Sequence, residues 1–106
     1  MVRVRGAWEI PLAAKKLTTS GDFHAIVALG CVIKGDTAHF EYVSDAAMEG
    51  IRAVSLELGI PITCGILTTY TEEQALARAG DDEENKGSEA ALSAIEMATL
   101  LQAMRK

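Results

Sequence analysis

Apolar residues recur along this chain in two patterns, and the switches between them divide it into short elements. Continuous apolar runs at residues 25–29 and 62–67 predict two strands that are covered on both faces. A shorter run at residues 2–4 predicts another strand, which ends at Gly6. Glycine or polar residues follow each run, as expected where a buried strand reaches a surface loop.

Helical spacing accounts for most of the remaining chain. Residues 10–17 predict a helix that Gly21 ends as a left-handed cap. Residues 40–58 predict the longest helix, because their apolar positions fall on one stripe and Gly59 follows.

Two further helices are predicted after the second long apolar run. Thr71 and Gln74 have the spacing of a capping box, which begins a helix that reaches Ala79. The acidic run at residues 81–84 predicts a solvated loop. Residues from about 87 to 104 predict the last helix, with an inward face formed by Ala91, Ala94, Ile95, Ala98 and Leu101.

Strands and helices therefore alternate, and one additional helix ends the chain. This order predicts a single α/β domain over residues 1–106, with a parallel sheet, right-handed crossovers and helices on both faces. Polar residues gather where the three strands end, at residues 6–9, 34–39 and 68–71. Ligands of parallel sheets bind at the carboxyl ends of the strands, so we expect functional groups there.

Composition narrows the functional classes. The 106 residues carry a formal net charge of -5 without a basic stripe, so nucleic-acid binding is not expected. No apolar run approaches the length of a membrane span, and no signal sequence opens the chain. The 2 cysteines form no disulfide framework, which favours a reduced, cytoplasmic setting. The cysteines and histidines lack the spacing of metal ligands, so no metal site is expected.

Residues 30–40 hold the main candidate for chemistry. They place two glycines, Thr37 and His39 between an apolar run and the longest helix. A histidine in such a loop can both give and take a proton near neutral pH. Judged alone, the ordinary interpretation of His39 as a surface or helix-capping residue is favoured.

Segments spread over nearly the whole chain resemble the lumazine synthase family. The matching segments are GAWEIP at 6–11, GCVIKGDTAHF at 30–40, GILTT at 65–69, EQALARAG at 73–80, NKG at 85–87 and EAALSAIEM at 89–97. The resemblance implies a flavodoxin-like, three-layer α/β/α sandwich that forms homopentamers or sixty-subunit shells, with riboflavin synthase as a further candidate partner. It also implies condensation of 5-amino-6-ribitylaminouracil with 3,4-dihydroxy-2-butanone 4-phosphate in riboflavin biosynthesis, without a metal or a cofactor.

The resemblance also implies roles for single residues. His39 matches a histidine that moves protons during imine formation and elimination, which reverses its ordinary interpretation. Arg78 matches a phosphate-binding arginine, and a guanidinium fork suits a phosphoryl group. Further substrate-binding residues are implied, in a site between adjacent subunits, at Ala7, Trp8, Glu9, Cys31, Val32, Ile33, Asp36, Thr37, Cys64 and Lys86.

Several of these residues also fit structural roles. A cation such as Arg78 is favourable near a helix C-terminus in any case. Thr37 fits an N-cap, and Trp8 fits a core or interface anchor. Lys86 fits an ordinary loop lysine.

The chain departs from the family pattern at its front. The pattern includes a preceding strand–helix segment, whose strand lies between those predicted at residues 2–4 and 25–29. The chain therefore matches the C-terminal two-thirds of the family fold. Three interpretations stand open: a piece of a longer protein, an engineered or split fragment, or direct pairing of residues 2–4 with 25–29 in a three-stranded sheet.

Single substitutions relative to the family pattern also bear on function. Cys64 replaces a phenylalanine that commonly borders the ligand ring, and Lys34 replaces a common arginine. Together with the missing segment, these changes leave two alternatives to catalysis. One is an inactive assembly scaffold on the same fold, and the other is a protein that holds a flavin or lumazine without turnover.

Overall fold

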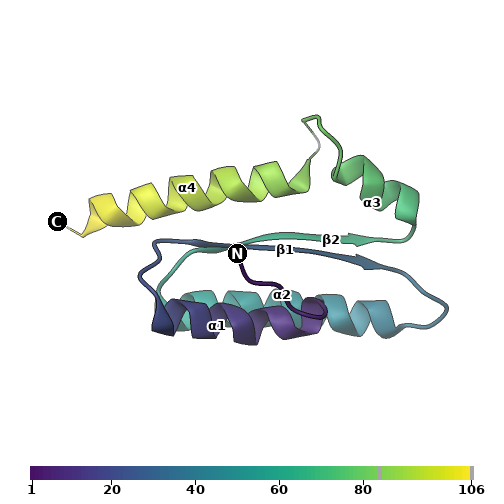
Figure 1. Ribbon diagram of the computed structural model, residues 1–106, viewed down its shortest axis with the longest axis horizontal. Coiled ribbons are helices and arrows are strands. Elements are labelled where there is room, and N and C mark those ends of the chain that lie inside the picture. The colour runs from purple at the N-terminus through teal and green to yellow at the C-terminus, as the bar shows by residue number, and fades with distance from the viewer. Residues whose placement is uncertain (84, 106) are drawn as a thin grey trace.

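A two-stranded parallel sheet lies between two layers of helices in the computed structural model, which describes residues 1–83 and 85–105 (Figure 1). The strands are β1 (Ile26–Ile33) and β2 (Ile62–Thr69). They pair in register from Ile26 opposite Ile62 to Ile33 opposite Thr69. Both strands therefore end at the same edge of the molecule.

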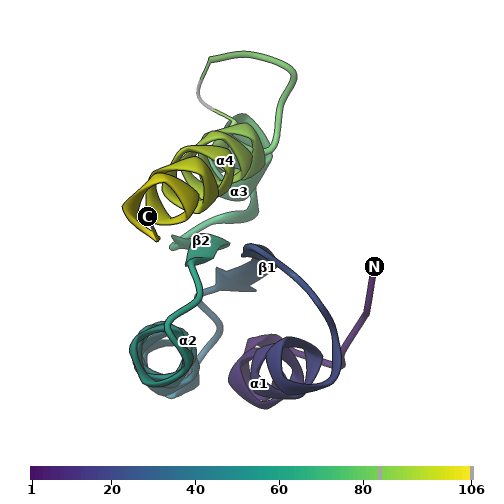
Figure 2. The same ribbon diagram turned by 90° about the vertical axis from the view of Figure 1, so that its left-hand side faces the viewer.

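Helices cover both faces of this sheet. On one face lie the short 3-10 helix η1 (Ala7–Glu9), α1 (Ile10–Ser20) and α2 (His39–Leu58). On the other face lie α3 (Glu72–Arg78) and α4 (Lys86–Met104), as Figure 2 shows. This arrangement confirms the expected α/β fold with a parallel sheet and three layers. No helix in the described part of the chain is long and apolar enough to cross a membrane.

The core lies between the sheet and the layer formed by α1 and α2. The predicted stripe of the longest helix faces it, with Ala47, Ile51 and Val54 buried. Ala28 and Val32 of β1 meet this layer from the sheet. Small and aliphatic side chains fill the core, as expected for a chain that is only 5% aromatic.

The prediction that β1 is covered on both faces is wrong. Burial alternates along the strand, and Val27, Leu29 and Ile33 are exposed on the face away from α1 and α2. The reason is the position of α4, which packs mainly over β2. The prediction also ended the strand too early, because pairing with β2 continues through Gly30 as far as Ile33.

The strand predicted at residues 2–4 is also absent. Val2 and Val4 are exposed and belong to no strand, and the sheet of the described chain contains only β1 and β2. A cleft of about 460 Å³ lies between residues 1–7, α1 and β1. Because a strand needs a neighbour within hydrogen-bonding distance, this separation excludes the three-stranded alternative for the described structure.

The helix ends show where the sequence predictions need correction. Gly59 has the left-handed conformation (φ 67°) and ends α2, as expected. Gly21 is extended instead (φ -125°, ψ 174°), so it is not a left-handed cap. Ile95 is 64% exposed, because the stripe that faces the sheet runs through Ala90 and Ala94. Residues 81–83 are exposed as predicted, and Glu84 lies outside the described residues.

Candidate functional site

One backbone hydrogen bond joins the starts of the two loops that follow the strands. The backbone N–H of Lys34 donates to the carbonyl of Thr69 at 3.0 Å, one residue beyond the end of β1. From this point residues 34–38 lead to α2, and Tyr70 and Thr71 lead to α3. The parallel register thus brings both predicted polar loops to one end of the sheet (Figure 1).

His39 is the first residue of α2, and its side chain is exposed. The N-cap position is Ala38, which offers no side-chain oxygen, so Thr37 is not the N-cap. Thr37 nevertheless satisfies one N–H group at the start of α2, because its Oγ1 accepts a hydrogen bond from the His39 N–H at 3.3 Å. The first turn of a helix has several N–H groups without helical partners, which favours an anion there.

The loop before His39 is open to a ligand. A Cβ added at Gly35 would meet no atom within 4 Å, and Asp36 and Thr37 are exposed. Gly35 does not have a positive φ, so the backbone there is not strained. Space beside the main chain is what close approach of a phosphoryl group requires.

Arg78 is the last residue of α3 and lines a shallow cleft of about 260 Å³. The capping box predicted for this helix is present. Thr71 Oγ1 accepts from the Gln74 N–H at 3.1 Å, and Gln74 Oε1 accepts from the Thr71 N–H at 3.3 Å. The cap orients α3 and therefore the arginine. The other residues that line the cleft are Thr68, Thr69, Tyr70, Gln74 and Ala77.

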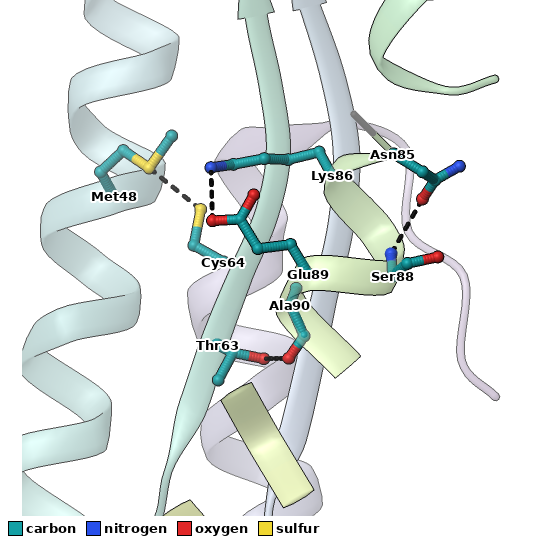
Figure 3. A network of polar contacts seen from close by, with 8 residues as sticks. All are labelled: Met48, Thr63, Cys64, Asn85, Lys86, Ser88, Glu89 and Ala90. Atoms are coloured by element: carbon teal, nitrogen blue, oxygen red, sulfur yellow. Dashed lines mark hydrogen bonds and ion pairs between the residues drawn. The ribbon is translucent and has the colours of Figure 1, made fainter. Parts of the chain in front are cut away.

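The strand residues assigned to the pyrimidine pocket lie on two faces of the sheet. Val32 is buried in the core between sheet and helices, whereas Cys31 and Ile33 are exposed on the opposite face. Cys64 points to the α2 side, where its Sγ lies 3.1 Å from Met48 Sδ (Figure 3). Both cysteines are free thiols.

Lys86 begins α4 on the face of the sheet away from Cys64. Its neighbour Asn85 caps the helix, since Asn85 Oδ1 accepts from the Ser88 N–H at 2.8 Å. The Lys86 ammonium lies 3.5 Å from Glu89 Oε1, a distance typical of a weak surface ion pair (Figure 3). A ligand carboxylate or phosphate can therefore replace this partner at little cost.

Ala7, Trp8 and Glu9 together form η1, directly before α1. Ala7 is buried, and Trp8 is 62% exposed. Trp8 is therefore not a core anchor within one chain, and its indole is accessible to a ligand or to a neighbouring molecule.

The structure places the loop of residues 34–38, His39 and Arg78 near one end of the sheet without joining them in a single pocket, whereas Cys64 lies in the first half of β2. None of the residues from 34 to 39 lines the cleft of Arg78. Tyr70 and Gln74 also line that cleft, although the sequence assigned Gln74 only to the helix cap and gave Tyr70 no individual role. The only sequence feature that could have identified them is their position directly after β2, at the start of α3.

The described residues hold no group of three or more His, Cys, Asp or Glu side chains that could bind a metal ion. The groups present are an imidazole, a guanidinium, an ammonium and open main chain. These groups suit binding of a phosphorylated ligand and transfer of protons to and from it.

One comparison with known proteins bears on this site. A family model described as 6,7-dimethyl-8-ribityllumazine synthase matches residues 1–102. The match contains η1, both strands, both strand-end loops and the positions of His39, Arg78 and Lys86.

Proposed function

Because this chain belongs to the 6,7-dimethyl-8-ribityllumazine synthase family, we propose that it is a transferase that condenses 5-amino-6-ribitylaminouracil with 3,4-dihydroxy-2-butanone 4-phosphate. The products are 6,7-dimethyl-8-ribityllumazine, inorganic phosphate and water. The observation that carries the proposal is the family match over residues 1–102, which includes every residue assigned to the site.

The reaction needs a group that moves protons in both directions. The amine adds to a carbonyl carbon and one water leaves as the imine forms. Phosphate then leaves by elimination, and a second water leaves when the other ring nitrogen closes onto the remaining carbonyl. We assign these proton transfers to the imidazole of His39. Its exposure at the start of α2 supports the assignment, since a proton shuttle must reach the ligand.

We assign the phosphoryl group to two sets of N–H donors. One is the open loop at Gly35, Asp36 and Thr37 with the first turn of α2, and the other is the guanidinium of Arg78. A fork of N–H donors binds phosphate oxygens in pairs, and backbone N–H groups add to it.

The pyrimidine and its ribityl chain are assigned to η1 and to the end of β1. The exposed indole of Trp8 offers a flat apolar surface, and Glu9 offers a carboxylate. The side chains of Ala7 and Val32 are buried in the core, so these two residues would contribute main-chain groups. Lys86 would reach the ligand from α4.

The site is proposed to form between two copies of the chain. His39 does not line the cleft that contains Arg78, which supports a site in which a second copy brings the other group to the ligand. Apolar side chains that one copy leaves exposed support a homo-oligomer, with a pentamer or sixty-subunit shell as the specific proposal. They are Val27, Leu29 and Ile33 of β1 and Leu92, Ile95, Leu100 and Met104 of α4.

The activity is tested by incubating the protein with both substrates and following lumazine absorbance. We expect turnover above the uncatalysed rate, and a loss of at least about a hundredfold in kcat for His39→Ala. His24→Ala is the matched control, because His24 is exposed and lies before β1, at the opposite end of the sheet. Equal activity of both variants would remove the role assigned to His39.

One observation favours the second candidate, an inactive assembly scaffold. Cys64 replaces an aromatic residue and turns toward Met48 on the core side, which leaves less surface to border a ligand ring. Sedimentation of a large particle without turnover would support this candidate. Quenching of flavin fluorescence on addition of that particle would instead favour a protein that binds the ring without reacting.

A further inference from the structure

Tyr70 is an aromatic residue that contacts both flanks of the loop before His39. Its ring lies 5.8 Å from the ring of Phe40, centroid to centroid, with an interplanar angle of 62°. The ammonium of Lys34 lies 5.9 Å from the centroid of the same ring. Lys34 opens the loop and Phe40 belongs to the first turn of α2, so Tyr70 contacts the segment that contains residues 35–39 at each end.

The backbone of Tyr70 is itself held in place. Its N–H donates to Gln74 Oε1 at 2.9 Å, so it shares the oxygen that completes the cap of α3. The carbonyl of the preceding residue, Thr69, accepts from the Lys34 N–H at 3.0 Å. The ring therefore projects from a fixed point at the start of the helix that ends in Arg78.

The two partners of the ring differ in how firmly they are held. Phe40 is only 7% exposed and packs in the core. Lys34 is exposed, and its cation lies over the ring face at a distance where the attraction is favourable. The ring edge contact to Phe40 adds to this, since edge-to-face pairs are favourable beyond their buried area.

We infer that Tyr70 is a positioning residue for the loop of residues 35–39. The ring holds the loop against the start of α3, and it thereby sets the orientation of Thr37 and His39 relative to the end of the sheet. The effect of Tyr70 on catalysis rests on the proposed function, whereas its effect on how rigidly the loop is held does not.

The test compares Tyr70→Ala, Tyr70→Phe and Tyr42→Ala. Tyr42 is the matched control, because it is 71% exposed on α2 and no ring contact is recorded for it among the described residues. Hydrogen exchange is measured at the hydrogen-bonded amides that flank the loop, those of Lys34, His39 and Glu41, and, as a reference, along β1. We expect Tyr70→Ala to raise exchange in the loop about fivefold to tenfold, consistent with loss of one aromatic and one cation–π contact. Tyr70→Phe keeps the ring, and Tyr42→Ala leaves it untouched, so both should behave as the parent.

Steady-state kinetics supply an independent measure of the effect. In Tyr70→Ala we expect KM for the butanone phosphate to rise about fivefold, while KM for the pyrimidine substrate stays unchanged. A merely less stable fold would lower the active fraction and leave both KM values alone. If the parent protein has no turnover, the proposed function fails, and the exchange result still decides the role of Tyr70.

Three results would overturn the inference. They are unchanged exchange at Lys34, His39 and Glu41 in Tyr70→Ala, an equal rise along β1, or a Tyr70→Phe variant as perturbed as Tyr70→Ala. If Tyr70→Ala does not fold, Lys34→Met provides the test, because it removes the cation and keeps the aliphatic part of the side chain. We then expect hydrogen exchange in the loop to rise about twofold to threefold. No rise in that variant would then count against the inference.

Discussion

Gly50 of α2 lies directly against the ring of Pro11 in α1, where a Cβ would sit 2.5 Å from Pro11 Cγ. A helix interior normally disfavours glycine, by about 1 kcal/mol relative to alanine. Here the absence of a side chain lets two helices of the same layer approach. The contact explains why the glycine belongs to the inward stripe of the longest helix.

We predict that Gly50→Ala lowers the free energy of unfolding by about 1 kcal/mol. Overpacking against a rigid ring costs about 1–3 kcal/mol, which exceeds the gain of about 1 kcal/mol in helix propensity. Denaturant unfolding measures the change. Ala53→Gly, at an exposed position of α2, calibrates propensity alone and should cost about 1 kcal/mol. A Gly50→Ala variant more stable than the parent would contradict the close contact.

Gly35→Ala should weaken substrate binding without changing the stability of the fold. A Cβ there meets nothing within 4 Å, so the unfolding free energy should stay within about 0.5 kcal/mol of the parent. If a phosphoryl group lies against this main chain, the added methyl should raise KM for the butanone phosphate about tenfold. An unchanged KM would place the phosphate elsewhere.

Thr71→Ala should weaken α3 and with it the placement of Arg78. The threonine oxygen accepts the Gln74 N–H at 3.1 Å, and loss of an N-cap oxygen costs about 1 kcal/mol. Hydrogen exchange of the α3 amides should rise about fivefold. Thr71→Ser keeps the oxygen and should behave as the parent; if it is as perturbed as Thr71→Ala, the cap is not the cause.

Two serines of α2 should respond to alanine in opposite ways. Ser44 is 5% exposed, and its Oγ has no hydrogen-bond partner among the described residues. Ser44→Ala should therefore leave stability unchanged or raise it by up to about 1 kcal/mol. Ser55 Oγ donates to the Ile60 carbonyl at 2.6 Å, so Ser55→Ala should cost about 1 kcal/mol. Urea unfolding of both variants makes the comparison, and equal losses would contradict it.

Much of the helical structure could be predicted because the signals are local. The capping box of Thr71 and Gln74 and the left-handed Gly59 involve groups within a few residues of one another. The stripe through Ala47, Ile51 and Val54 reflects the period of the helix alone. For the candidate site, the sequence pattern predicted that polar loops follow the strands, and the parallel register places the loops after β1 and β2 at one end of the sheet.

The sequence by itself determined which segments are helical, the helix ends at Gly59 and Thr71, and the family to which the loops belong, because these signals are local along the chain. Only the tertiary structure decided which strands pair and which apolar faces stay open. Val4 finds no strand within reach, and Leu29 stays 58% exposed beside the start of α4, although both have strand-like sequence surroundings. Tyr70 likewise acquires its partners from the loop after β1 and from α2, because ring contacts join residues that only the folded chain brings together.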